Sequence, residues 1–535
     1  MSGHSIRARS PRGEPSVPSV AHDPDAIASF LEDAAHFPGG HAAGIAVPSS
    51  EAQVAALLQT ESTILPVGAQ SSLTGGATPM GEVVLSTARL NRIIEIGPDF
   101  VRVEPGVTLV DLDSALTEAG KYFPPAPTFT GAFVGGIIAT NAAGAATFKY
   151  GTTRDWVRAL TVVLPNGDVL DIERGVVTAR TDGQFEIVLR DRTVHVQVPR
   201  YRMPQVAKLS AGYFAAPGMD LIDLFIGSEG TLGVTVEATL RVLRTRPAMC
   251  LAFVPCPNRR TALDLVTRLR DGSRDTWRSG DPSGLDVSAI EHLDARCLTL
   301  LREDGADRLF GVPVRASAGM ALLITLELPP MTSAQAFEEI GQAREPHAPD
   351  TSLVRFCRLL DEAGVLDAVE IAVPGDRARA GQLVAFREAV PAAVNARVGR
   401  AKHSVDARIA KTAADMIVPF EHLEELLDIY DSEFGRRHLD LAVWGHISDG
   451  NLHPNVIPRS MSDVESGSAA ILACGREVIR LGGSPLAEHG VGRNPVKQRL
   501  LLELYGRDGV DAMRAVKRAL DPDCRLSPGV LFTEP

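Results

Sequence analysis

Four side chains in the second half of the sequence could bind a metal ion and move a proton. His446 and His453 flank an Asp-Gly-Asn run, and Glu488 and His489 are adjacent. Imidazole and carboxylate groups suit Zn²⁺ or Mn²⁺, and a neutral imidazole can take a proton from a substrate. The residues alone leave two interpretations open: one shared site, or separate histidines in the core or on the surface.

The spacing of the first two histidines bears on this choice. His446 and His453 are an odd number of positions apart, so on an unbroken strand they would face opposite sides. Asp449 and Gly450 lie between them and are typical of a turn or a bulge. Such a turn could bring both imidazoles to one face.

Three glycine-rich loops in the first half could position a phosphate-bearing ligand. They are residues 66–76, 135–144 and 227–233. Glycine lets a backbone approach a phosphate and point its N–H groups at it. Any one loop could be an ordinary turn, but three together could wrap an extended dinucleotide. The Rossmann and P-loop patterns do not occur in their proper context, so this reasoning ends at a phosphate-bearing ligand.

Five segments of the first half, taken in order, resemble the FAD-binding domain of the p-cresol methylhydroxylase and vanillyl-alcohol oxidase superfamily. They are residues 66–76, 134–144, 150–151, 163–167 and 225–233. The resemblance covers residues 46–243 and implies FAD, with the pyrophosphate on the first loop and the isoalloxazine near the second.

The resemblance also implies which residues bind the cofactor. They are Pro66, Val67, Gly68, Ala69, Gln70, Ser71, Ser72, Pro127, Gly135, Gly136, Thr140, Asn141, Gly144, Tyr150, Gly151, Glu229, Gly233 and Val234. Gln70 and Ser71 replace the usual Gly-Thr of the family, but Ser71 keeps the hydroxyl. The first loop holds no His or Cys, so we expect non-covalent FAD.

The second half resembles the FAD-linked D-lactate, glycolate and D-2-hydroxyglutarate dehydrogenases. Residues 446–453 resemble their H-x-G-D-G-N-x-H motif, residues 487–497 their G-E-H-G-I-G-x-x-K motif, and residues 521–529 their C-terminal D-P to N-P-G motif. Three small departures occur, at Ser448, Ala487 and Ser527. By this likeness His446, His453 and Glu488 are metal ligands, His489 is the base, and Asn451 contacts the substrate or the flavin.

The chemistry implied by the resemblance is consistent. Oxidation of a 2-hydroxy acid removes the hydroxyl proton and a hydride from C2. A divalent metal lowers the hydroxyl pKa, a neutral His takes the proton, and flavin N5 accepts the hydride. Arg387, in a segment resembling the family's W-x-x-R-[EH], suits the substrate carboxylate, although a surface pair with Glu388 is equally compatible. Lys411 is a second candidate.

We predict an α+β flavoprotein with two domains. A flexible tail (1–25) precedes a PCMH-type FAD-binding domain (26–245), followed by a substrate or cap domain (246–520) with helices and an antiparallel sheet; residues 521–535 return to the FAD domain. Ser50 predicts a helix start, and Asn166-Gly167 predicts a hairpin over residues 160–172. Residues 221–226 suggest a strand, residues 131–147 a loop, and residues 174–204 an elaborated hairpin or surface insertion.

Composition excludes several classes of protein. The 535-residue chain has 45% hydrophobic and 22% charged residues and a net charge of −12, typical of a soluble globular protein without a basic face for nucleic acid. No stretch is apolar enough for a transmembrane segment. Six scattered cysteines fit buried thiols in a reducing compartment. We expect a cytoplasmic enzyme rather than a mitochondrial one, and a homodimer stays open.

The electron acceptor and two alternative functions also stay open. By family analogy the acceptor is a quinone, a cytochrome or an electron-transfer flavoprotein. The first alternative is a non-redox flavoenzyme like alkylglycerone-phosphate synthase, and the second is an inactive flavin-binding subunit. The intact Asp449–His453 run opposes the first alternative, and the retained histidines oppose the second.

Overall fold

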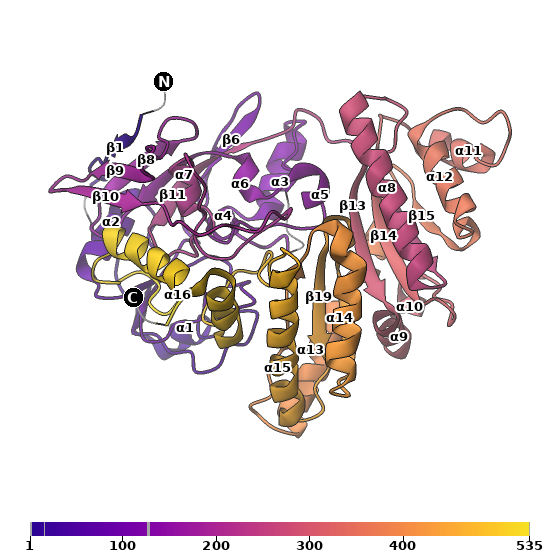
Figure 1. Cartoon of the computed structure of the whole chain (residues 1–535). Coiled ribbons are helices and arrows are strands. Elements are labelled where there is room, and N and C mark those ends of the chain that lie inside the picture. Colours follow the sequence, from indigo (N-terminus) through magenta and orange to yellow (C-terminus); the bar gives the residue numbers. More distant parts are fainter. Residues whose placement is uncertain (1–2, 15, 126–128, 534–535) are drawn as a thin grey trace. The chain divides into compact units, whose positions relative to one another are not determined.

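The computed structural model describes residues 3–14, 16–125 and 129–533, and the chain divides into two compact units (Figure 1). Unit 1 comprises Met1–Gly144, Gly151–Arg246 and Gly482–Pro535. Unit 2 comprises Ala145–Tyr150 and Pro247–Leu481. Helix α16 (Pro495–Leu520) lies within the predicted second domain but belongs to compact unit 1.

Unit 1 contains a small parallel sheet in the order β2-β4-β3, formed by β2 (Gly44–Ala46), β4 (Val83–Ser86) and β3 (Ile64–Val67). Helix α2 (Glu51–Thr60) begins after Ser50, whose hydroxyl accepts a hydrogen bond from the Gln53 N–H at 3.3 Å, as the capping pattern predicted. The same helix buries Val54, Leu57 and Leu58. The first glycine-rich loop therefore begins at the end of strand β3, within a well-packed region.

A five-stranded antiparallel sheet forms the other main layer of unit 1. Its order is β5 (Ile93–Ile96), β6 (Phe100–Val103), β11 (Val234–Arg241), β7 (Val157–Val163) and β8 (Val169–Glu173). Strands β7 and β8 form the predicted hairpin, with Gly167 at φ +82° in its turn. Strand β11 begins directly after the third glycine-rich loop.

Two short helices of unit 1 lie where the sequence predicted a strand and a loop. Besides α2 and α16, the helices of this unit are α1 (Pro24–Ala28), α3 (Leu109–Glu118), α4 (Val134–Ala139), α6 (Thr153–Trp156) and α7 (Ile222–Phe225). The expected strand at 221–226 is helix α7, because its Asp223 turns inward to two arginines. The expected loop at 131–147 contains helix α4, whose Ile137 and Ile138 are buried; two glycines in that helix hide its propensity.

The N-terminal residues are not a free tail. Strand β1 (Ser5–Arg7) pairs in parallel with β9 (Gln184–Val188), which forms a hairpin with β10 (Thr193–Gln197). Arg9 then binds Glu51 and Asp171, each at 2.5 Å. The predicted hairpin within residues 174–204 therefore offers an edge strand, and the N-terminal residues cover it.

Unit 2 is built on one antiparallel sheet. Its order is β15 (Glu370–Ala372), β12 (Ala248–Cys256), β14 (Met320–Leu328), β13 (Val287–Asp294), β18 (Leu441–His446), β19 (Asn451–Val456) and β16 (Thr412–Ala413), with β17 (Met416–Ile417) also paired to β19. Its core includes Phe253 and Phe386, whose rings meet edge-on with centroids 5.2 Å apart.

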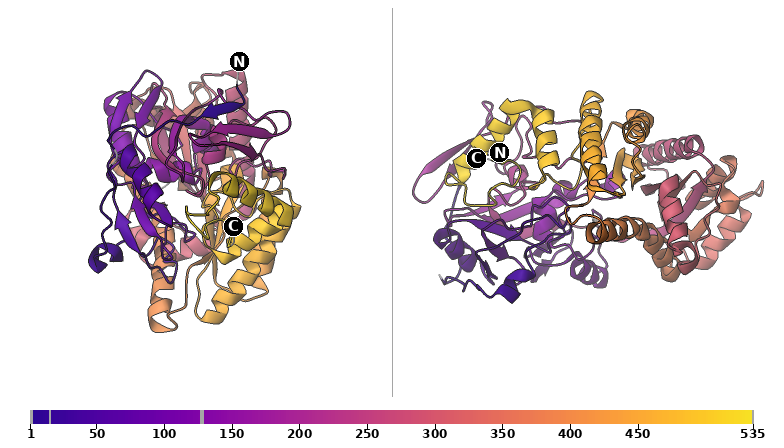
Figure 2. Two further views of the ribbon diagram at one scale, coloured as in Figure 1. Left: turned by 90° about the vertical axis from the view of Figure 1, so that its left-hand side faces the viewer. Right: turned by 90° about the horizontal axis from the view of Figure 1, so that it is seen from below.

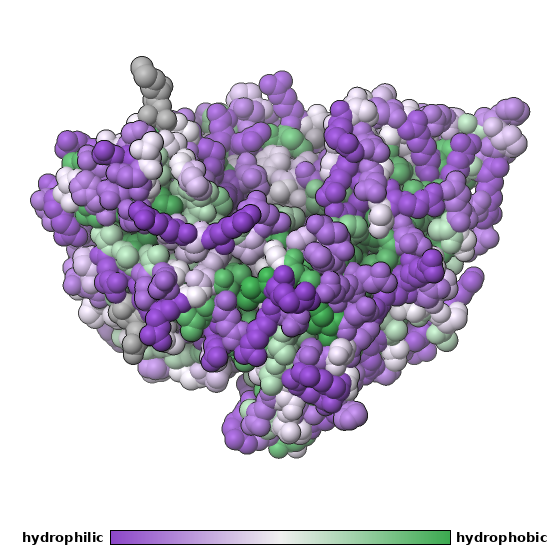
Figure 3. All heavy atoms as spheres, viewed as in Figure 1, coloured by the Kyte–Doolittle hydropathy of each residue, from purple (hydrophilic) through white to green (hydrophobic). Residues whose placement is uncertain are grey.

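Helices cover this sheet. They are α5 (Thr147–Tyr150), α8 (Arg259–Ser279), α9 (Ala295–Glu303), α10 (Ala306–Leu309), α11 (Ser333–Gln342), α12 (Ser352–Glu362), α13 (Arg377–Ser404), α14 (Leu423–Gly435) and α15 (Met461–Arg480). Helices α14 and α15 lie side by side (Figures 1 and 2). Among the described residues, no helix combines the length and apolarity needed to cross a membrane, and hydrophilic residues cover most of the face seen in Figure 3.

Candidate active site

A cavity in unit 1 is lined by all three glycine-rich loops. The predicted cofactor residues that line it are Pro66, Val67, Gly68, Ala69, Gln70, Ser71, Ser72, Gly135, Gly136, Thr140, Glu229, Gly233 and Val234. Its walls are therefore mostly backbone and small side chains, which suits an extended dinucleotide. Glu488 and His489, from the far end of the sequence, line the same cavity.

Two adjacent glycines in α4 differ in how closely other residues pack against them. A Cβ on Gly135 would lie 2.6 Å from the Cβ of Pro105, whereas a Cβ on Gly136 would meet nothing within 4 Å. Gly135 thus serves close packing of the protein, and Gly136 faces open space among residues that line the cavity. Phe133 also lines the cavity, and its ring packs against Gly68. No sequence pattern distinguishes Phe133 from other apolar residues, so it was not predicted.

Some predicted cofactor residues lie elsewhere. Asn141 accepts a hydrogen bond from the Arg154 N–H at 2.9 Å and donates to the Leu209 carbonyl at 3.3 Å. Tyr150 belongs to unit 2, where its hydroxyl donates to Glu327 at 2.6 Å. Gly144 and Gly151 do not belong to the described lining of the cavity, and Pro127 lies outside the described residues.

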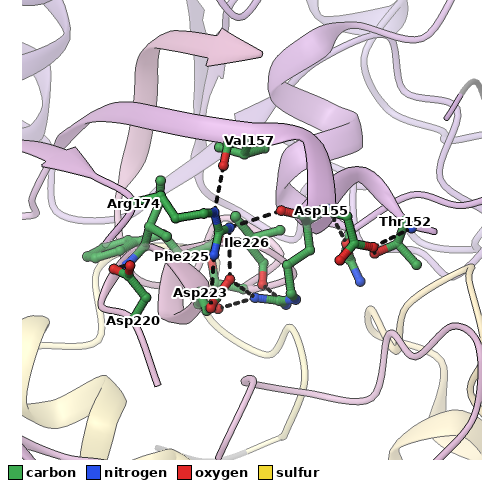
Figure 4. A network of polar contacts seen from close by, with 12 residues as sticks. Thr152, Asp155, Val157, Arg174, Asp220, Asp223, Phe225 and Ile226 are labelled. Carbon is green, nitrogen blue, oxygen red and sulfur yellow. Dashed lines mark hydrogen bonds and ion pairs between the residues drawn. The ribbon is translucent and has the colours of Figure 1, made fainter. Parts of the chain in front are cut away.

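Two partly exposed arginines hold the third glycine-rich loop in place (Figure 4). Asp223 accepts hydrogen bonds from Arg154 and Arg174, each at 3.0 Å. Arg154 also donates to the Ile226 carbonyl at 2.6 Å, directly before the loop. The loop is joined to α4 as well, because the Gly227 N–H donates to the Ile138 carbonyl at 2.9 Å. The network therefore holds the third loop, which forms part of the cavity wall.

The turn that carries His489 contains a buried ion pair. Lys208, whose side chain is 0% exposed, donates to Glu488 Oε2 at 2.9 Å. His489 Nε2 lies 3.4 Å from Glu488 Oε1, and the imidazole is 27% exposed. Glu488 thus has a cation on one oxygen and an imidazole near the other. The imidazole is accessible, as a group that exchanges protons with a ligand must be.

The second group of predicted residues lies on a hairpin of unit 2. Strands β18 and β19 are joined by the short helix η3 (Ile447–Asp449) and by Gly450 at φ +84°. His446 pairs with Asn451, and Trp444 pairs with His453. Cross-strand partners share a face, and residues two apart share a face. The reversal therefore puts both histidines on one side, with ring centroids 5.4 Å apart.

Each of these two histidines has a carboxylate beside its Nδ1. Glu291 Oε2 lies 3.2 Å from His446 Nδ1, and Asp415 Oδ1 lies 3.3 Å from His453 Nδ1. Burial opposes the charge on Glu291, but Arg387 and His446 lower its pKa to about 2. A carboxylate at Nδ1 favours a proton there and leaves Nε2 to bind a cation, the usual arrangement of metal-binding histidines.

Arg387 and Asn451 make protein contacts in the structure. Arg387 donates to Glu291 at 2.9 Å and to Glu388 at 2.6 Å, so the guanidinium that we expected to bind substrate bridges two protein carboxylates. Asn451 donates to Asp415 and to the Met416 carbonyl, each at 2.9 Å. Both residues therefore hold the carboxylates that face the two histidines.

Ser448, which departs from the glycine of the motif, supports the turn. Its hydroxyl accepts a hydrogen bond from the Ile290 N–H at 3.2 Å, and its carbonyl accepts one from Arg270 at 2.6 Å. The Arg270 guanidinium lies over the Phe420 ring, 3.3 Å from its centroid. The substitution therefore adds a contact to the neighbouring strand and removes none of the histidines' partners.

Sequence reasoning missed the partners of the site more than the site itself. Glu291, Asp415 and Lys208 carried no signal as functional residues, because each is a single charged residue far along the chain from its partner. Lys208 and Glu488, for example, are 280 positions apart. Asp415 stood beside the candidate Lys411, and that proximity was the one clue available.

Comparison with known proteins matches both halves of the chain to families. Residues 42–173 match the FAD binding domain, and residues 251–531 match the C-terminal domain of FAD linked oxidases. Among solved structures, an alkyldihydroxyacetonephosphate synthase superposes with a TM-score of 0.59 at 15% identity, covering 95% of this chain and 82% of that chain. At that identity the likeness concerns the fold alone.

Three relatives are similar over most of their length. A glycolate oxidase subunit of Bacillus subtilis is 29% identical over 88% of this chain and 84% of its own. A D-2-hydroxyglutarate dehydrogenase of Xanthomonas citri pv. viticola is 29% identical over 91% and 89%. A D-lactate dehydrogenase of Anaerostipes hadrus is 26% identical over 87% and 83%. The chain belongs to the FAD-linked oxidases, and it is an oxidoreductase that uses FAD.

Proposed function

We propose that the protein oxidises a small D-2-hydroxy acid to the 2-oxo acid, with His489 as the base and a divalent cation bound by His446, His453 and Glu488. The observation that carries the proposal is the hairpin of unit 2, where two imidazoles share a face and each has a carboxylate at Nδ1. The relatives' names support the substrate class, because glycolate, lactate and 2-hydroxyglutarate are all 2-hydroxy acids.

The cavity of unit 1 fits the cofactor. Its glycine-rich walls offer backbone N–H groups, and the open space at Gly136 is where an added side chain would meet the ligand. We propose that Ser71 and Ser72 contribute hydroxyl donors to the pyrophosphate. FAD, when bound, supplies the acceptor for the hydride that leaves C2 of the substrate.

The donor set fits Zn²⁺ or Mn²⁺. Two neutral imidazoles and one carboxylate are typical ligands of both ions. The carboxylates Glu291 and Asp415 favour the neutral tautomer that is protonated at Nδ1 and unprotonated at Nε2, which is the form that binds a cation. A divalent cation, when bound, supplies positive charge that lowers the pKa of the substrate hydroxyl.

His489 has the surroundings of a general base. Its partly exposed imidazole lines the cofactor cavity and can take the hydroxyl proton. Glu488 Oε1, 3.4 Å from Nε2, would stabilise the imidazolium that results. The hydroxyl loses its proton and C2 loses its hydride, so that the C2–O bond becomes a carbonyl, and the electrons then pass to an acceptor of the quinone, cytochrome or flavoprotein class.

The cation that binds the substrate carboxylate is proposed from two candidates. Arg387 has Glu291 and Glu388 on its terminal nitrogens, so we propose that it mainly orients Glu291 and, through it, His446. Burial lowers the pKa of Lys411 to about 8. A substrate carboxylate would offset that burial, so Lys411 stays the second candidate for this role.

Product formation tests the function. The purified holoenzyme is incubated with an artificial electron acceptor and D-lactate, L-lactate, glycolate, D-2-hydroxyglutarate or L-2-hydroxyglutarate, and the 2-oxo acid is quantified. We expect one D-acid or glycolate to yield its 2-oxo acid, and the L-acids to yield far less. A flavin-containing protein that oxidises none of them would contradict the proposal and favour the non-redox flavoenzyme or the inactive subunit.

A further inference from the structure

We infer that Glu229 is a positioning residue for the turn that carries His489, rather than a residue that binds the cofactor. The inference rests on the proposed function only in giving His489 the role of base. Glu229 lies in the third glycine-rich loop and lines the cofactor cavity. Its position in that loop is why it was expected among the cofactor-binding residues.

Both oxygens of the Glu229 carboxylate accept a hydrogen bond from the turn. Oε1 accepts a hydrogen bond from the Val491 N–H at 2.8 Å, and Oε2 accepts one from the Gly492 N–H at 2.8 Å. Two consecutive backbone donors on one carboxylate fix both the distance and the orientation of the turn, as in other charge-assisted pairs. They also direct the carboxylate at residues 491–492.

The backbone of Glu229 is anchored to the cavity wall. Its N–H donates to the Ala139 carbonyl at 2.8 Å, at the end of helix α4. Its φ of +52° lies in the left-handed region, which a residue with a side chain adopts when its surroundings enforce it. Glu229 therefore connects the wall of the cofactor cavity to the turn that follows His489.

The turn is shaped to receive this carboxylate. Gly490 has φ +74°, and a Cβ there would lie 3.0 Å from both Cδ and Oε1 of Glu229. Lys497 donates to the Gly490 carbonyl at 3.2 Å and attracts the carboxylate. On its other side the turn is joined to the first glycine-rich loop, because the Arg493 N–H donates to the Thr74 carbonyl at 3.0 Å. His489 thus precedes a segment held by two loops of the cavity.

The test compares Glu229→Gln with Asp168→Asn in the full-length holoenzyme. Glutamine has one acceptor oxygen, and its amide group would face a backbone N–H, so one hydrogen bond to the turn is lost. Asp168 is also a buried carboxylate of unit 1 that accepts a backbone N–H, from Arg190 at 2.9 Å, but it does not line the cavity. It is therefore a matched control for the loss of a buried carboxylate.

Hydrogen exchange reads the turn directly, without any substrate. We expect the amides of residues 488–493 to exchange at least tenfold faster in Glu229→Gln and at the unaltered rate in Asp168→Asn, with FAD retained in both. Unchanged exchange in Glu229→Gln, or an equal increase in both variants, would overturn the inference.

Kinetics then separate positioning from general damage. Flavin reduction is followed anaerobically with whichever of D-lactate, glycolate or D-2-hydroxyglutarate reduces the unaltered enzyme fastest. Glu229→Gln should slow reduction at least tenfold, yet add no further loss to His489→Ala, because Glu229 acts through His489. Effects that multiply would overturn the inference. If His489→Ala alone left the rate unchanged, the proposed base would fail, and exchange alone would decide the role of Glu229.

Discussion

The cofactor cavity of unit 1 and the histidine hairpin of unit 2 are lined by different kinds of groups. The cavity is walled by backbone: Gly135 packs against Pro105, and Gly136 leaves space open. The hairpin depends on charge, because Glu291 and Asp415 face its two histidines from neighbouring segments. We therefore expect added side-chain volume to disturb the cavity, and the loss of a carboxylate to disturb the hairpin.

The largest effect should come from His489, which lines the cavity but has charged neighbours. We expect His489→Ala to lower the rate of flavin reduction by about 10²–10⁴-fold, the usual contribution of a general base, with the bound flavin content unchanged. Stopped-flow absorbance measures both. His195→Ala, at an exposed position of β10, should leave the rate unaltered. Equal rates for the two variants would show that His489 is only a structural part of the cavity wall.

Lys208 tests how much a single buried ion pair contributes to the stability of unit 1. Lys208→Met leaves Glu488 as a buried carboxylate without its cation, which costs about 3–5 kcal/mol of stability in such pairs. Urea unfolding followed by flavin fluorescence should show the loss, and a second change, Glu488→Gln, should restore part of it. Lys121→Met, a surface lysine bound to the Pro98 carbonyl, is the control. Without such recovery, the lost ion pair would not be the cause of the lower stability.

Asp415 sharpens the comparison on the side of the hairpin. Asp415→Asn keeps the shape of the residue but weakens the acceptor at His453 Nδ1. Changes of this kind typically reduce metal affinity by about 10–100-fold, and competition with a chelator for Zn²⁺ would measure it. Asp428→Asn, at an exposed position of α14, should not change the affinity. Equal affinities for both variants would contradict a role for the carboxylate beside His453.

The two adjacent glycines should give the smallest effects, of two different kinds. Gly135→Ala places a Cβ against Pro105, and overpacking of this sort costs about 1–3 kcal/mol of stability. Gly136→Ala should leave stability intact but raise the dissociation constant for FAD about tenfold, or ~1.4 kcal/mol. Thermal unfolding and FAD titration of the refolded apoprotein separate these outcomes. The same response from both variants would contradict the separate roles of Gly135 in packing and Gly136 in leaving room for the cofactor.

The sequence was most informative where a local pattern determines the structure. Ser50 marks the start of α2, and Asn166-Gly167 marks the turn between β7 and β8. The glycine-rich loops that line the cavity were also visible, because close approach of backbone to a ligand requires glycine.

What could not be predicted depends on contacts between distant residues. Residues 221–226 have the apolar composition of a strand, but Asp223 binds Arg154 and Arg174, and the segment is helical. The N-terminal residues have no apolar pattern, yet they complete a sheet with β9. Glu229 lines the cavity, but its hydrogen bonds to Val491 and Gly492 could not be predicted, because nothing in a loop sequence tells where a carboxylate points.

One measurement tests the central claim most directly. The holoenzyme is mixed anaerobically with D-lactate, glycolate or D-2-hydroxyglutarate, and flavin absorbance is followed before chelation, after it, and after Zn²⁺ or Mn²⁺ is added back. We predict that one acid bleaches the flavin, that chelation slows bleaching at least tenfold, and that the metal restores it. Bleaching at the same rate before and after chelation would contradict the metal site, and a flavin that none of these acids bleaches would contradict the proposed reaction.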